Sequence, residues 1–293
     1  MHRLQFVLTV LTVLTVPTLE AQQKLARRIA IAPDASIRIY NLSGTTRVIG
    51  WDRDSIVVTG LAPAGTTFYM GGAGRIAKLG LERDEKAGSL SGMGMLEVRV
   101  PRGARVWVKS AEGSIEVDGL SGEADLATVG GGIKVTGTLR LLTAETLEGD
   151  IAATGASQLV RVKTGTGKIV LSGSTGDLTA STVAGPVLLL DAHVTSARIE
   201  TVSGAVSYDG TLDHRGSLEI QTHSGEVELR LPPSVSAEFD LHSIGGTIFI
   251  ALSPKLGTPP RPLKKPQFFA TGGGGARVVV RSFKGNIRLV GRD

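Results

Sequence analysis

Glycine recurs every 18 residues through the middle of the chain, and this period constrains the fold more than any other feature. The positions at this spacing are Gly113, Gly131, Gly149, Gly167 and Gly185. Each follows a hydroxyl residue by three positions, and these are Ser110, Thr128, Thr146, Thr164 and Thr182. A fixed period of this length indicates a chain that builds one structural unit repeatedly.

The repeat extends in both directions with looser spacing. Downstream copies follow at Gly204, Gly225, Gly246 and Gly285, and an isolated upstream copy lies at Gly44, with Asn41 in the hydroxyl position. The last copy, residues 277–290, is expected to end the stack. The sequence therefore predicts about ten copies of the unit.

Apolar residues alternate with polar ones on both sides of each glycine. Ile115 and Val117 follow Gly113 by two and four positions, and Ile169 and Leu171 follow Gly167 in the same way. A period of two predicts strands with one buried face. Each copy should therefore be strand, tight turn, strand. In the turn, we expect the hydroxyl side chain to bond the local backbone and the glycine to adopt a positive φ.

Eighteen residues are too few for a strand–helix–strand unit, which needs about 30 residues. The mature chain also shows no sustained 3.6-residue apolar period, the signal expected of a helix. We therefore predict an all-β fold, a single-stranded parallel β-solenoid (β-helix) of about ten coils of roughly 18–21 residues. Either two or three sheets per coil fit the pattern. Oppositely charged residues one period apart, such as Glu145 and Lys163, should be neighbours on the outer face.

The first 21 residues predict a secretory signal. Arg3 precedes an apolar run at 4–16, Pro17 ends it, and Ala21 offers a small residue for cleavage. Retention as an uncleaved anchor is the alternative. The chain has no cysteine, which excludes disulfides and a lipid-modified cysteine. The mature protein is expected to be exported: periplasmic, on the outer surface or secreted.

Residues 22–293 predict a single β-solenoid domain with irregular insertions at 61–95 and 251–276. The first insertion is rich in glycine and methionine, and is expected to be a flexible loop or an irregular extension of the first coils. The second is rich in proline, lysine and arginine, and is expected to be a loop. Because the ends of a solenoid expose unpaired strand edges, these irregular regions are candidates for protecting them.

Residues for catalysis do not converge in the repeat frame, and we predict no catalytic, metal or cofactor site. Sugar binding commonly uses exposed aromatic rings, so Trp51 and Trp107 are candidate ligand contacts. The basic residues of the second insertion are candidates for contacting an acidic polymer or lipid headgroups, and they are Lys255, Arg261, Lys264 and Lys265. The net charge is +5, and basic residues are not interleaved with aromatics, which argues against nucleic acid as a partner.

Several motifs together resemble the bacterial putative-adhesin domain family. They are the start at Ser43–Asp52, the string at Val98–Val106, and the repeated Thr-x-x-Gly coils that follow a signal segment. The resemblance covers roughly residues 30–291. It implies a β-solenoid of unknown function in the cell envelope, and it supplies no catalytic residues to transfer.

The leading hypothesis is a non-enzymatic, exported cell-envelope β-solenoid that serves adhesion or another structural interaction. Its partner would be an envelope polysaccharide, acidic lipid headgroups or another envelope protein. One alternative is a carbohydrate-active β-helix enzyme or a polysaccharide-binding protein. Another is a periplasmic partner of an envelope-stress regulator.

Overall fold

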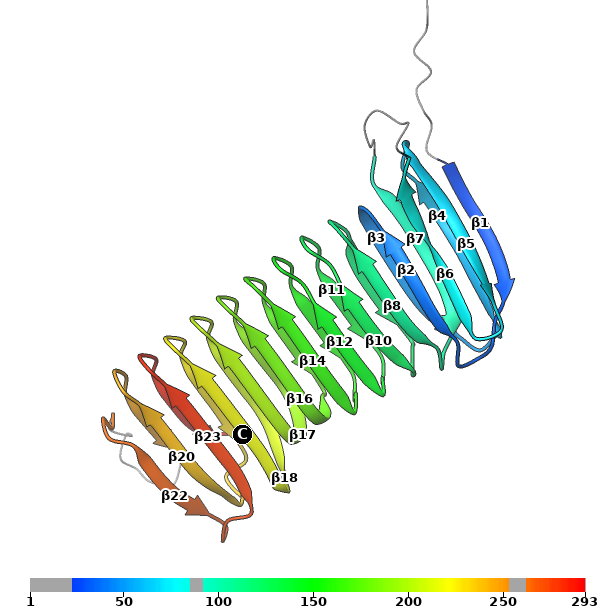
Figure 1. Cartoon of the computed structure of the whole chain (residues 1–293). Helices are drawn as coiled ribbons and strands as arrows, with labels where there is room; N and C mark the ends of the chain where they lie inside the picture. The colour runs from blue at the N-terminus through cyan, green and yellow to red at the C-terminus, as the bar shows by residue number, and fades with distance from the viewer. Residues whose placement is uncertain (1–22, 85–91, 253–261, 293) are drawn as a thin grey trace, which may run out of the picture.

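The computed structural model describes residues 23–84, 92–252 and 262–292, which form a long rod of stacked coils (Figure 1). In these ranges the regular secondary structure consists of β-strands alone. The strands join into one 24-stranded hydrogen-bonded network. The predicted all-β parallel solenoid is therefore confirmed. The predicted signal segment, residues 1–21, lies outside the described residues.

Each coil contributes one strand to each of two sheets that face each other across the core. In stacking order, the first sheet contains β5 (Thr66–Ala73), β6 (Ile76–Arg83), β2 (Ser36–Asn41), β8 (Arg105–Ser110), β10 (Glu123–Ala127), β12 (Leu141–Glu145), β14 (Leu159–Thr164), β16 (Thr175–Thr182), β17 (Val187–Thr201), β18 (Val206–Thr222), β23 (Ala276–Ser282), β20 (Ala237–Ser243) and β22 (Gln267–Thr271).

The second sheet stacks in the same direction. It contains β1 (Gln23–Ala30), β4 (Ser55–Ala62), β7 (Gly94–Pro101), β3 (Gly44–Trp51), β9 (Ser114–Asp118), β11 (Ile133–Thr136), β13 (Ile151–Thr154), β15 (Ile169–Ser172), the first parts of β17 and β18, β19 (Val227–Leu231), β24 (Ile287–Gly291) and β21 (Ile248–Ala251). The long strands β17 and β18 bend around a corner, so each belongs to both sheets.

The core consists of aliphatic columns between the two sheets. In the coil at β14 and β15, for example, Val160, Val162, Ile169 and Leu171 are all buried. Pairing keeps like residues in register: Ile133 lies beside Ile151, and Ile151 beside Ile169. The 18-residue period therefore becomes a set of aliphatic ladders, in which each coil buries its apolar face against its neighbours.

The glycine of the repeat is required for close approach of neighbouring coils. A Cβ added at Gly131 would lie 2.0 Å from the carbonyl oxygen of Gly113, and one at Gly149 would lie 1.9 Å from that of Gly131. Our expectation of a positive φ is wrong for these positions: Gly44 has φ of 87°, but Gly131 and Gly149 do not lie in the left-handed region. The space between coils, rather than the backbone angle, excludes a side chain.

The hydroxyl residue of the repeat bonds the turn, as predicted. The N–H of Gly167 donates to Thr164 Oγ1 at 3.2 Å, and the hydroxyl of Thr164 donates to the carbonyl of Gly149 at 3.1 Å. One buried side chain thus closes its own turn and also links two coils. This double use explains why a hydroxyl residue recurs at this position, which is buried in each coil from Ser110 to Ser282.

The order of coils in space departs from the order in sequence at the C-terminal end. β23 and β24 lie between the coil of β18 and β19 and the coil of β20 and β21 (Figure 1). The expectation that the last copy ends the stack is therefore wrong. The earlier copy around Gly246 is the outermost one, because the chain passes it, forms β22, and then returns to fill the gap.

The N-terminal end shows the same inversion. β6 and β7 form a coil outside that of β2 and β3, although they follow it in sequence. β8 and β9 then stack on β2 and β3. Gly94 belongs to the glycine ladder, because a Cβ at Gly44 would lie 1.9 Å from its carbonyl oxygen. Gly94 lies within the predicted 61–95 insertion, so the predicted copies did not include this one.

Antiparallel strands cover both ends of the rod. β4 and β1 pair in turn on β7, and β5 pairs on β6. At the other end β22 pairs on β20, and Phe269 stacks on Phe239 with ring centroids 4.8 Å apart. The described parts of the two predicted insertions therefore contain ordered strands that pair with the end coils.

Candidate functional site

An apolar ridge runs along the turn that joins the two sheets. It is formed by the first residue after the buried hydroxyl residue in most coils from Thr128 onward, and Gly165 and His223 hold this position in the other two. Its members are between 46% and 65% exposed, and they are Val129, Leu147, Val183, Val202, Phe283 and Ile244. Turns normally carry polar residues, so a column of exposed aliphatic and aromatic side chains is notable. An exposed apolar surface of this kind is typical of an interaction site.

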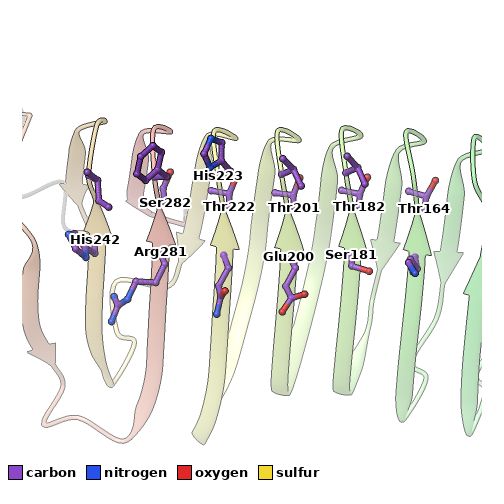
Figure 2. A pocket seen from close by; sticks show the side chains of 16 residues that line it. Thr164, Ser181, Thr182, Glu200, Thr201, Thr222, His223, His242, Arg281 and Ser282 are labelled. Atoms are coloured by element: carbon purple, nitrogen blue, oxygen red, sulfur yellow. The ribbon is translucent and has the colours of Figure 1, made fainter.

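A groove of about 640 Å³ lies beside this ridge and crosses the coils from Lys163 to His242 (Figure 2). The ridge residues Val183, Val202, Phe283 and Ile244 form one side. The outward residues at the ends of the first-sheet strands form the other, and they include Ser181, Glu200, Gln221, Arg281 and His242. We call this feature the turn-edge groove. It follows the long axis of the rod, because each coil contributes equivalent positions to it.

The floor of the turn-edge groove is a row of buried hydroxyl residues. Thr182, Thr201, Thr222 and Ser282 lie along it, and Figure 2 shows them in one line. Each accepts a hydrogen bond from the backbone N–H of the glycine three positions later, at 2.8–3.1 Å. These hydroxyls are therefore committed to the turns. They hold the shape of the floor and leave the ridge as the main contact surface.

Charged groups in the groove are neutralised by local partners. Glu200 accepts from Arg198 at 2.7 Å, and Lys163 lies 3.5 Å from Glu145 as the sequence predicts. Arg281 makes a bidentate pair with Asp240, and this hydrogen bonding lowers the pKa of the Asp240 carboxyl. The groove therefore exposes apolar surface, and the charged side chains around it are already paired. This arrangement suits an extended partner better than a small ion.

The two histidines of the groove lie on different elements. The ring of His223 stacks on Phe283 with centroids 4.9 Å apart, and His242 lies on β20. Across the described ranges, no group of three or more His, Cys, Asp or Glu side chains is arranged to hold a metal ion. The stacked pair broadens the ridge with two flat rings, and ring faces of this kind can pack against apolar groups.

The two predicted tryptophans lie on different sheets. Trp107 lies on β8 of the first sheet, half-buried, and its ring meets Tyr40 edge to face at 5.3 Å. Trp51 ends β3 of the second sheet, and its Nε1 donates to the carbonyl of Ser55 at 2.8 Å. The structure therefore brings Trp107 to a tyrosine rather than to Trp51.

The predicted basic residues lie at the C-terminal end of the rod. Lys264 and Lys265 are exposed and lie between the bridging residue Leu263 and β22. Lys255 and Arg261 lie outside the described residues. The two described lysines are therefore next to the outermost coil, whereas β8, which carries Trp107, lies toward the opposite end of the rod (Figure 1).

A further polar cluster joins residues that the sequence analysis did not group. His193 Nε2 lies 2.8 Å from Asp213, and Thr195 donates to the same carboxylate at 2.7 Å. The Nδ1 of His193 lies 2.5 Å from the hydroxyl of Thr211. The 18-residue spacing of these pairs was the signal that could have found them. The cluster is exposed, so it reads as a cross-coil link at the surface.

The structure describes no helix that is long and apolar enough to cross a membrane. No curated protein matches the chain by sequence.

Three solved structures are similar to this chain. A putative cell adhesion protein from Clostridium sporogenes is 11% identical, with 92% of this chain and 100% of that chain covered and a TM-score of 0.24. A putative adhesin from Bacteroides fragilis is 10% identical, with 92% and 99% covered and a TM-score of 0.47. A putative lipid binding protein from Parabacteroides distasonis is 12% identical, with 91% and 96% covered and a TM-score of 0.47.

The family comparison concerns the regular array and the groove. Residues 138–260, which include Val183, Val202 and Ile244 of the ridge, match the model of the Toastrack DUF4097 family. This match confirms the predicted resemblance to a β-solenoid domain family of unknown function: through residues 138–260, the chain is similar to the Toastrack DUF4097 family.

Proposed function

We propose that this protein is a non-enzymatic, exported β-solenoid of the cell envelope that works by adhesion. The export part of the proposal is supported by the signal pattern at residues 1–21 of the sequence. The adhesion part is supported by the exposed apolar ridge beside the turn-edge groove, and by the resemblance of the repeat motifs to the putative-adhesin domain family. Periplasmic and surface-exposed locations are both compatible with this role.

The observation that carries the proposal is the continuous turn-edge groove. Its apolar ridge repeats with the coils, so the binding surface grows with the length of the rod. Solenoids commonly use such extended surfaces to hold long partners. Val183 is 55% exposed and Val202 is 49% exposed, and a partner that covers them would remove apolar surface from water.

The groove residues also form one rigid row. Val202 N–H donates to the carbonyl of Val183 at 3.2 Å, and His223 N–H donates to that of Val202 at 3.2 Å. Hydrogen bonds therefore join the backbones of the turns from coil to coil. A pre-ordered surface of this kind loses little conformational entropy when a partner binds, which favours adhesion to a repeating polymer or a rigid protein.

The test is binding of the mature protein to isolated envelope fractions of its host. Val183→Asp and Val202→Asp place charge on the ridge, and each is expected to weaken binding at least tenfold. Leu190→Asp is the matched control, because Leu190 is also exposed, at 38%, but lies on the second sheet. Equal binding by all three variants would contradict the groove as the adhesion surface.

Two further measurements address the rest of the proposal. Fractionation of host cells should place the protein in the envelope or the medium, and recovery from the cytosol would contradict export. Incubation with a panel of polysaccharides should release no new reducing ends. Turnover that disappears in a groove variant would favour the carbohydrate-active alternative instead.

A further inference from the structure

Aromatic and cationic side chains gather on the outer face of the first sheet near the N-terminal end. The rings are Tyr69 on β5, Tyr40 on β2 and Trp107 on β8, and the cations are Lys78 on β6, Arg38 on β2 and Lys109 on β8. We call these six residues the aromatic–cationic face. Their strands are neighbours in the order β5, β6, β2, β8 (Figure 1).

This clustering uses three of the five tyrosine and tryptophan residues of the chain. The sequence holds three tyrosines and two tryptophans in 293 residues. Tyr40, Tyr69 and Trp107 come from three separate strands, yet lie in one strip of the sheet. Tyr208, in contrast, is buried in the core, and Trp51 lies on the second sheet. The gathering of these side chains on one outer face indicates a surface that can bind the flat faces of ligand rings.

Rings and cations alternate along the strip. Lys78 Nζ lies 5.3 Å from the ring centroid of Tyr40 and 5.1 Å from that of Tyr69. Lys109 Nζ lies 4.4 Å from the Trp107 ring, and the Arg38 guanidinium lies 5.8 Å from the same ring. These distances fit cation–π contacts, which hold the cations above the rings.

Gly80 lets this arrangement form. It lies between Tyr69 and Tyr40 in register, and a Cβ there would be 2.4 Å from the Tyr40 carbonyl oxygen and 3.0 Å from the Tyr69 hydroxyl. The absent side chain leaves room for the Tyr69 ring to lie across the strand. Burial raises the pKa of Tyr69 to about 12, so its hydroxyl stays neutral and can donate a hydrogen bond.

The three cations of this face, Arg38, Lys78 and Lys109, have no carboxylate partner within ion-pair distance among the described residues. The neighbouring Arg105, by comparison, lies 2.6 Å from Glu123. Asp125 and Glu82 lie at the borders of the strip, and burial raises the pKa of Asp125 while Lys109 opposes that shift. An incoming anion can therefore engage these cations without breaking an ion pair.

We propose that the aromatic–cationic face binds an acidic polysaccharide. Carboxylate groups of the polymer would contact Lys78, Arg38 and Lys109, and its sugar rings would lie against Tyr40, Tyr69 and Trp107. A neutral polymer would leave the cations unsatisfied, and an acidic polymer without rings would leave the aromatic surface unused. This inference deepens the proposed adhesion function by naming a ligand class, and it assigns that ligand to a surface separate from the turn-edge groove.

The probes are polygalacturonate and hyaluronate, with two controls that each remove one feature. Methyl-esterified polygalacturonate keeps the sugar rings but loses the charge, and polyglutamate keeps the charge but lacks the rings. We expect binding to at least one acidic glycan, and binding at least tenfold weaker to both controls. Equal binding of polyglutamate would reduce the face to a general anion surface and overturn the proposal, as would binding of neither glycan.

The variants locate the site. Trp107→Ala and Lys109→Gln are expected to weaken glycan binding at least fivefold. Arg161→Gln is the matched control, because Arg161 lies exposed on the same sheet, on β14, and loses the same charge. Thermal unfolding of each variant checks that it folds. If Arg161→Gln lowers binding as much as Lys109→Gln, the effect is one of net charge and the proposal fails.

Two readouts separate this proposal from the adhesion function as a whole. Trp107 fluorescence in a Trp51→Phe background should change on glycan addition, because the ring is at the site. Val202→Asp, on the groove, should keep glycan binding. If Val202→Asp abolishes glycan binding and Trp107→Ala does not, the groove is the glycan site and the present assignment is wrong. If the glycan assay fails while envelope binding survives, the adhesion function stands without this ligand.

Discussion

The middle of the rod and its two ends are built from the same repeat, but their coils stack in different orders. From β8 to β19, consecutive coils stack in sequence order. At both ends the stacking order is inverted, and antiparallel strands close the edges. The middle shows that a local period is enough to build an array. The ends show that stopping an array requires contacts between distant segments.

The largest expected effect comes from removing the inserted C-terminal coil. A chain that ends at Gly275 lacks β23 and β24, and with them the buried Val278, Val280, Ile287 and Leu289. At about 1.5–3 kcal/mol for each buried aliphatic side chain, the loss is on the order of 6–12 kcal/mol. Hydrogen exchange should show that residues 206–251 lose protection. The control starts the chain at Ile31, which removes only β1, a mostly exposed strand that pairs with β4 alone.

The truncation also tests whether the inverted stacking order at this end contributes to stability. A shortened chain that unfolds at the same urea concentration as the mature protein would show that β20 and β21 can stack directly on β18 and β19. The order in which the coils stack would then have no effect on the free energy of unfolding.

A methyl group in the glycine ladder is the next largest perturbation. Gly131→Ala forces a Cβ to within 2.0 Å of a backbone oxygen in the adjacent coil, and the cost should exceed about 3 kcal/mol because the backbone must move. The adjacent Gly130 has open space around its Cβ position, so Gly130→Ala should change the free energy of unfolding by less than about 0.5 kcal/mol. Equal unfolding free energies for the two variants would refute the close-approach explanation.

The same substitution at an end sharpens the comparison. Gly246→Ala lies in the outermost coil, where a Cβ would be 2.4 Å from the carbonyl oxygen of Gly285. We expect a smaller cost than at Gly131, because an outer coil has a neighbour coil on one side and can shift outward. Chemical denaturation of the three variants ranks them.

A polar residue in the aliphatic ladder comes third. Ile169 is fully buried, so Ile169→Asn places an amide between sheets without partners and should cost about 3–4 kcal/mol. The preceding Lys168 is exposed, and Lys168→Ala should cost less than about 0.5 kcal/mol. Comparable losses in urea denaturation would mean that the inward and outward positions have been assigned to the wrong faces.

The smallest effect concerns an ion pair across the inverted C-terminal stacking. Arg281 on β23 bonds Asp240 on β20, and the hydrogen bond lowers the pKa of Asp240. A lowered folded-state pKa stabilises the protein above the unfolded value of about 3.9, and the stabilisation is lost as pH falls through the folded value. Asp240→Asn should therefore cost about 1 kcal/mol at pH 7, and less as the pH falls below about 4. A difference from the parent protein that stays constant from pH 7 to pH 3 would argue against this pair.

The sequence predicted the middle of the rod because its signals are local. The hydroxyl residue and glycine of one turn are three positions apart, and flanking strands alternate with a period of two. Ile169 could thus be assigned to the core and Lys168 to the surface without a structure. The missed copy at Gly94 carries the same signals, with Leu96 and Val98 at the expected offsets. Its glycine-rich surroundings concealed it.

The candidate sites were less predictable, because they depend on pairing between distant strands. Trp107 was identified as a ligand contact, but its partner Tyr40 became a neighbour only when β8 stacked on β2. The ridge could have been read from the sequence, since Val183 and Val202 each follow a repeat threonine directly.

The sequence by itself determined the coil: its length, its buried and exposed positions, and the need for glycine and a hydroxyl residue at each turn. These properties follow from contacts within a coil and between equivalent positions, which a period records. The tertiary structure alone decided which coil stacks on which, how the ends close, and which outward residues become neighbours. Every coil presents nearly the same edge to the next, so the period cannot specify the order. The stacking order is set by the segments that connect the coils and by the strands that cover the two ends.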